Sequence, residues 1–140
     1  MTREELELRQ QDVLDALLRG RVPDGFDRRS ATMTTRLLRA KRRSEAVTAV
    51  PGLREVPDFP RRFDAWADDR PRRGCAHDDV LDFVVDAAGP LPEPLASVRA
   101  VERVYRHLAI AGRDRRPGHR RYVVAGGGRV WHVGPRQALP

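Results

Sequence analysis

The stretch ALLRGRVPDGFDRRSATMTTRLLRAKRRSEAVTAVPGL, residues 16–53, decides the fold of this 140-residue chain. A turn containing Pro23 and Asp24-Gly25 separates two helical patterns, and Asp27 is a residue type that caps a helix N-terminus. Pro51-Gly52 ends the second pattern. Apolar residues at helical spacing predict a stripe that the second helix buries, namely Met33, Leu37, Ala40, Val47 and Val50.

The segment before this stretch predicts a first helix from Thr2 to Arg19. Thr2 and Glu5 have the spacing of a capping box, and Gly20 is a typical residue just past a helix end. The apolar residues expected to share one buried face of this helix are Leu6, Val13, Leu14, Leu17 and Leu18.

Two more helices are expected downstream. One starts at Asp58, with Pro60 in its first turn and with Phe63 and Trp66 facing the core, and it stops before Pro71. The other runs from His77 or Asp78 to Ala88.

The last third of the chain changes its periodicity. After a stiff connector at residues 89–94, a fifth helix is predicted from Leu95 through Leu108 to Gly112, and residues 113–121 are expected to form a charged loop. Residues 122–124 and 130–133 are β-rich and flank three glycines, which indicates a β-hairpin. A lone hairpin is marginally stable, so it must pack on the helices or pair with a further strand from this chain or another.

These patterns predict an α+β fold that is mainly α, with about five helices followed by a C-terminal β-hairpin. We expect two units. Residues 1–89 form a helical partner-docking domain, and residues 90–140 add a helix and a hairpin as a peptide-binding, winged-helix-like subdomain.

The charge of the chain favours an acidic partner. Lys and Arg number 27 against 20 Asp and Glu, which gives a net charge of +7 and a pI near 11.0. Nucleic acid, an acidic peptide and the acidic face of a protein all fit. No apolar run approaches the roughly 18 residues of a membrane span. Cys75 is the only cysteine and no secretory signal is seen, so we expect no intrachain disulfide and a cytoplasmic location.

No arrangement of residues in the sequence predicts catalysis or metal binding. Cys75 and His77 face different sides of a helix, and Asp78, Asp79 and Asp82 have the position of residues that complement a helix dipole. The glycine run at 126–128 lacks the context of a phosphate loop. The histidines lie without the spacing of metal ligands, at positions 77, 107, 119 and 132.

Two binding surfaces remain. The basic run from Arg36 to Arg43, with the winged-helix-like end, is the best candidate for DNA binding. A run of charges on a helix is usually a solvent-exposed face, and we do not expect nucleic acid to be the partner. The hairpin edge favours addition of an extended peptide as an extra strand, unless the chain itself covers both edges. The expected peptide-binding residues are Arg120, Arg121, Tyr122, Val123, Val124, Arg129, Val130, Trp131, His132 and Val133.

Several short motifs follow one another between residues 6 and 88, in the order Leu17-Leu18, Val22-Pro23-Asp24-Gly25-Phe26-Asp27, Leu37-Leu38-Arg39-Ala40-Lys41-Arg42, Val50-Pro51-Gly52-Leu53, the aromatic residues Phe59, Phe63 and Trp66, and Asp82-Phe83. In this order they resemble a helical family that is labelled as a DNA-binding domain and accompanies multinuclear non-haem iron oxidative (MNIO) enzymes. The methanobactin-type partner subunit is a member of that class. The terminal strand at residues 130–133 is more weakly similar.

The resemblance implies a non-catalytic subunit that forms a heterodimer with an MNIO enzyme and holds the leader of a ribosomally made precursor peptide. The iron would lie on the partner enzyme, and no cofactor on this chain. Enzyme docking would use the helical domain, through Arg36, Arg39, Arg42 and Arg43. The alternatives are a small DNA-binding transcriptional regulator and an interaction module for an unrelated enzyme.

Overall fold

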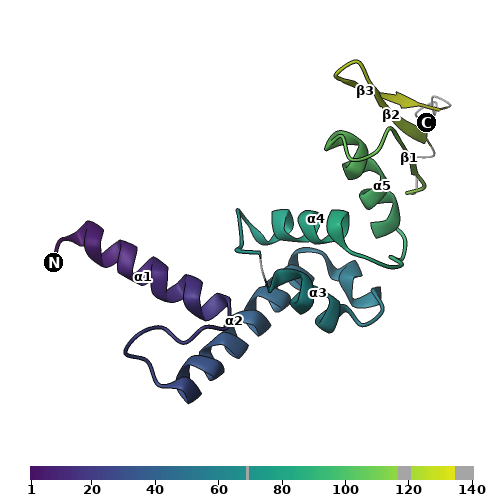
Figure 1. Cartoon of the computed structure of the whole chain (residues 1–140). Coiled ribbons are helices and arrows are strands. Elements are labelled where there is room, and N and C mark those ends of the chain that lie inside the picture. The colour runs from purple at the N-terminus through teal and green to yellow at the C-terminus, as the bar shows by residue number, and fades with distance from the viewer. Residues whose placement is uncertain (69, 117–120, 135–140) are drawn as a thin grey trace.

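The computed structural model describes residues 1–68, 70–116 and 121–134. It confirms the α+β, mainly α class, with five α-helices followed by an antiparallel sheet (Figure 1). The elements in chain order are α1 (Arg3–Leu18), α2 (Arg28–Ala49), the 3₁₀ helix η1 (Pro51–Glu55), α3 (Phe59–Ala67), α4 (Ala76–Asp86), α5 (Leu95–Tyr105), β1 (Ala111–Asp114), β2 (Arg121–Gly126) and β3 (Arg129–Val133).

The predicted caps of the first two helices are confirmed. Thr2 and Glu5 form a reciprocal capping box at the start of α1. Gly20 adopts a left-handed φ of 68° just past its end. The Asp27 carboxylate accepts the Ser30 backbone N–H at 2.8 Å and so satisfies a donor that the first turn of α2 leaves unpaired.

The apolar stripes predicted for these helices are buried only in part. Leu17 is the buried residue of α1, while Leu6 and Leu14 are exposed. Met33 and Leu37 of α2 are 63% and 64% exposed, because this helix turns other residues inward. The Thr35 hydroxyl donates to the Leu17 carbonyl at 2.7 Å, which fixes the crossing point of the two helices. The residues that α2 buries are Ala31, Thr35, Arg42 and Ala46.

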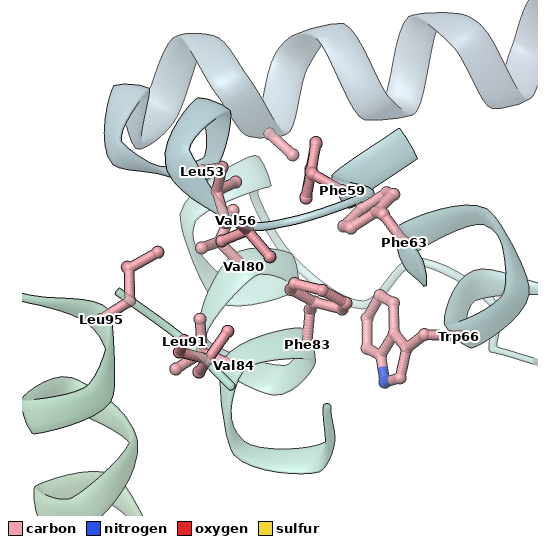
Figure 2. Close-up of a cluster of buried hydrophobic side chains, with 11 residues drawn as sticks. Leu53, Val56, Phe59, Phe63, Trp66, Val80, Phe83, Val84, Leu91 and Leu95 are labelled. Atoms are coloured by element: carbon pink, nitrogen blue, oxygen red, sulfur yellow. The ribbon is translucent and has the colours of Figure 1, made fainter. Parts of the chain in front are cut away.

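The main core lies between α2, η1, α3 and α4 (Figure 2). Phe63 and Phe83 are fully buried and meet edge to face, with ring centroids 5.3 Å apart. Trp66 packs edge-on against Phe83, and its indole N–H donates to Asp86 at 3.2 Å. The prediction that Phe63 and Trp66 face the core together is therefore confirmed. Leu91 and Leu95 extend this core from the connector into α5.

The predicted hairpin has a third strand, and the predicted fifth helix is too long. The helix α5 ends at Tyr105, and Ala111–Asp114 form β1 instead of a helix end and a charged loop. The reason is tertiary: Gly112 lies so close to α5 that a Cβ atom there would stand 2.4 Å from the Ala100 carbonyl oxygen. Glycine at this position lets β1 pack on α5, and β1 then completes the sheet.

The sheet has the order β1-β2-β3, with antiparallel neighbours. Val123 of β2 is fully buried against Val101 and Val104 of α5, which forms a second, smaller core. The end of β1 is also tied to α5, since the Arg115 backbone N–H donates to the Ser97 hydroxyl at 2.8 Å. Figure 1 shows the sheet beside α5 at one end of the molecule and α1 projecting from the other.

Candidate functional site

The sheet has one covered and one open face. Val123 and His132 are cross-strand partners on the face toward α5. The Tyr105 hydroxyl lies 2.5 Å from Nε2 of His132, so this hydrogen bond ties β3 to the end of α5. Tyr105 is a residue of this site that the sequence did not indicate. Its partner His132 lies 27 residues along the chain, so no local pattern connects the two.

The opposite face of the sheet carries exposed apolar side chains. Tyr122, Trp131 and Val133 are each about half exposed, at 50%, 48% and 55%. They share this face because Tyr122 pairs with Val133 and Val124 pairs with Trp131. The Arg113 guanidinium lies 5.6 Å from the centroid of the Tyr122 ring. The face is therefore both aromatic and cationic.

A cationic cleft of about 510 Å³ opens beside the end of β1 and the start of β2. It is lined by Arg113, Asp114, Arg115, Arg121 and Tyr122. Arg116 donates to both carboxylate oxygens of Asp114, which raises the pKa of the Arg116 guanidinium. The Asp114 charge is thus paired with an arginine at the wall of this cleft.

The strand β3 forms one edge of the sheet, and within the described residues no strand pairs with its outer side. The Ala125 N–H donates to the Ile110 carbonyl at 2.8 Å, on the β1 side of β2. Successive residues of a strand direct their backbone groups to opposite sides, so the odd-numbered residues of β2 form hydrogen bonds with β1 and the even-numbered residues with β3. Trp131 therefore turns its backbone groups toward β2. By the same alternation, Val130 and His132 turn theirs toward the open edge.

The expected peptide-binding residues are thus distributed over different surfaces. Arg129 is exposed at the start of β3, and Arg121 opposes Asp114 across β1 and β2. Val123 is part of the core and has no free surface. Arg120 lies outside the described residues. The open edge and the aromatic face together contain most of the other predicted residues.

Three of the four arginines expected to dock a partner form ion pairs inside the chain. Arg39 pairs with Asp68, and Arg43 lies 2.5 Å from Asp64. Arg36 is exposed on α2. Asp64 belongs to α3 and Asp68 follows that helix, 21 and 29 residues along the chain from their arginines, so helical spacing within α2 did not indicate these two pairs.

Arg42 is the most constrained of these arginines. Its Nε and Nη2 donate to the two Asp79 carboxylate oxygens at 2.8 and 2.6 Å, and its Nη1 donates to the Arg70 carbonyl at 2.7 Å. The guanidinium also lies over the Trp66 ring, 5.5 Å from its centroid. Arg42 and Asp79 are 9% and 3% exposed. This bidentate pair joins α2 to α4 within the fold.

The acidic residues near Cys75 have structural roles. The Asp78 carboxylate accepts the Cys75 backbone N–H at 3.0 Å, and this bond is the main cause that lowers the pKa of Asp78. Asp82 accepts from Arg106 at 2.6 Å. Among residues 1–68, 70–116 and 121–134, no three His, Cys, Asp or Glu side chains are grouped to hold a metal ion. In the same residues, no helix is long and apolar enough to cross a membrane.

The chain belongs to the SCO6045-like family. The model of the SCO6045-like C-terminal domain matches residues 7–89, more than half of the chain. This match spans α1 to α4 and ends before α5 and the sheet. No curated protein matches the chain, and no solved structure matches it.

Proposed function

We propose that this chain is a non-catalytic accessory subunit that captures an extended segment of a precursor peptide by strand addition at β3. The observation that carries the proposal is the edge itself. Val130 and His132 direct their backbone N–H and C=O groups away from β2, and no described strand lies on that outer side of β3. Backbone hydrogen bonds at such an edge supply affinity, and alternate side chains supply register.

The side chains beside the edge favour an acidic peptide with apolar residues at alternate positions. Every second side chain of an added strand would lie on the face of Trp131 and Val133, next to the exposed Arg129. Arg113 lies on the same face and increases its positive charge. The net charge of +7 assists the approach of an acidic leader segment.

The resemblance to MNIO partner proteins supports an iron oxygenase as the enzyme that modifies the captured peptide. In this proposal the iron and the oxygen chemistry belong to that enzyme, and this chain contributes binding alone. The helical domain docks the enzyme, with Arg36 as an exposed contact. A groove of about 570 Å³ beside Arg43, Val47 and Phe59 lies on the same domain and offers apolar contact area. Arg42 acts by holding the domain together, because its charge is buried against Asp79.

The test is co-purification of the tagged chain expressed with its neighbouring genes. We expect an iron-containing protein and a short ribosomal peptide to be retained in stoichiometric amounts. Recovery with promoter DNA, in a complex that dissociates steeply with added salt, would contradict the proposal and favour the DNA-binding regulator.

A pair of variants at one position separates backbone pairing from side-chain contact. His132→Pro removes the outward N–H, and proline is tolerated on an edge strand where this group faces solvent. His132→Ala removes the same contact with Tyr105 but keeps the N–H. We expect His132→Pro to weaken retention of the recovered peptide at least about tenfold relative to His132→Ala. Equal binding by the two variants would contradict strand addition at this edge.

A further inference from the structure

The cationic cleft at the end of the sheet is lined from both faces of the sheet. Arg113 of β1 pairs with Tyr122 of β2, and both side chains lie on the open face. The next pair along the two strands, Asp114 and Arg121, lies on the face toward α5. Arg115 follows β1 directly and also lines the cleft. Three arginines therefore converge on a space of about 510 Å³.

The acidic residue in the lining does not cancel this charge. Asp114 is 1% exposed, and Arg116 donates to its carboxylate through the backbone N–H, Nε and Nη2, at 3.1, 2.9 and 2.6 Å. With Arg116 included, four arginines stand against one carboxylate at this end of the sheet. The cleft therefore has a net positive charge and favours an anion.

Arg113 and Arg115 present exposed side chains from a backbone that is held in place. Among the described residues, neither guanidinium forms an ion pair. The Arg113 guanidinium lies 5.6 Å from the centroid of the Tyr122 ring. The Arg115 backbone N–H donates to the buried Ser97 hydroxyl at 2.8 Å. An anion that binds here meets cations on an ordered main chain, which lowers the entropic cost of binding.

The position of the cleft favours the carboxylate of a peptide. Guanidinium groups form two parallel hydrogen bonds with a carboxylate or a phosphate group. Val133 pairs with Tyr122, so one row of side chains runs from Arg113 across the open face to β3. Neighbouring strands lie about 4.8 Å apart, so the cleft is about 12 Å from a strand added at β3, a distance that about four extended residues span.

A single strand of nucleic acid also binds to arginines and aromatic rings, but it needs cations along its whole path. Its backbone carries a charge at every nucleotide and gains affinity from several phosphate contacts. Between the cleft and the exposed Arg129, the described residues of the open face include Trp131 and Val133, which are about half exposed. A cationic cleft beside an apolar row fits a peptide in which acidic residues flank an apolar extended segment.

We propose that the cleft formed by Arg113, Arg115 and Tyr122 binds the carboxylate of an Asp or Glu residue that flanks the peptide segment captured at β3. The inference rests on the proposed function and adds an acidic anchor to it. Backbone pairing alone permits a peptide to shift along an edge strand by two residues with the same faces exposed. An anchor beyond the Val133 end of β3 fixes the register as well as adding affinity.

The test is fluorescence anisotropy of dye-labelled hexaglutamate with the full chain. Arg113→Gln/Arg115→Gln removes the two exposed cations of the cleft. Arg28→Gln/Arg29→Gln is the control, because it removes two exposed arginines at the start of α2 and gives the same net charge. Nonspecific attraction falls equally in both variants, so we expect the cleft variant to bind hexaglutamate at least about fivefold more weakly than the control.

Two results would overturn this inference. One is equal binding of hexaglutamate by the two double variants. The other is tighter binding of a dye-labelled thymidine hexanucleotide than of hexaglutamate by the wild-type chain, which would indicate nucleic acid as the ligand. Both results concern the cleft, whereas the comparison of His132→Pro with His132→Ala tests capture at β3. A failure of the acidic anchor is therefore distinguishable from a failure of strand addition.

Discussion

Replacing Arg42 should destabilise the whole helical domain, although it lies in a run of arginines that resembles a solvent-facing surface. Arg42→Met would leave the Asp79 carboxylate buried without its bidentate partner and would leave the Arg70 carbonyl without its donor. Removing one member of a buried ion pair costs about 3–5 kcal/mol. For a chain of 140 residues this corresponds to a fall in melting temperature of about 10–15 °C.

The free energy of unfolding in urea is the appropriate assay, with Arg36→Met as the matched control. Arg36 is on the same helix but exposed, so its loss should change stability by less than about 0.5 kcal/mol. The double variant Arg42→Met/Asp79→Leu should be more stable than Arg42→Met alone, because an apolar pair leaves no buried charge. The reasoning about this pair would be refuted if Arg42→Met lost no more stability than Arg36→Met. It would also be refuted if the loss in the double variant equalled the sum of the losses in Arg42→Met and Asp79→Leu.

Two further predictions concern the sheet junction and a helix cap. Gly112→Ala should lower the free energy of unfolding in urea by about 1–3 kcal/mol, because the added Cβ would lie 2.4 Å from the Ala100 carbonyl oxygen. Gly52→Ala is the control and should have little effect, because the space around Gly52 is open. Equal losses of stability in the two variants would contradict the packing of β1 on α5. The pKa of Asp27 should lie below its ordinary value of 3.8, because the Asp27 carboxylate accepts the Ser30 backbone N–H. The stability that this cap contributes is therefore present above about pH 3.8 and is lost as the pH falls through the lowered pKa. A carboxyl chemical-shift titration measures this pKa, and a value at or above 3.8 would contradict the cap.

The elements with local signals were predictable from the sequence. Thr2, Gly20 and Asp27 act within three residues of the helix ends that they mark, so their roles do not depend on the rest of the fold. The β-rich runs around the triple glycine likewise specify a hairpin by themselves. These signals were sufficient for the order of the elements and for the mainly α class.

The parts that were missed depend on contacts between distant residues. The strand β1 has the sequence AGRD, without a β-branched residue, and it forms because β2 and α5 provide its partners. The pairing of Arg42 with Asp79 spans 37 residues, so helical periodicity could not reveal it. Helical spacing also predicted burial of Met33 and Leu37, but it does not indicate how much of a stripe a neighbouring element covers.

Only the register of the three strands shows which backbone N–H and C=O groups of β3 face the open edge. Periodicity alone placed the side chains of residues 130–133 on alternate faces but did not determine which N–H groups point outward. The hydrogen bond from Ala125 to Ile110 provides that information, and Ile110 lies in the segment that the sequence assigned to the end of the fifth helix.

Amide hydrogen exchange by NMR tests the open edge most directly. In the free protein we predict fast exchange for the Val130 and His132 amides and slow exchange for the Trp131 amide, which faces β2. Addition of the co-purified peptide should slow exchange at Val130 and His132 and leave Trp131 unchanged. Slow exchange at both outward amides in the free protein, or no change when the peptide binds, would contradict peptide capture at β3.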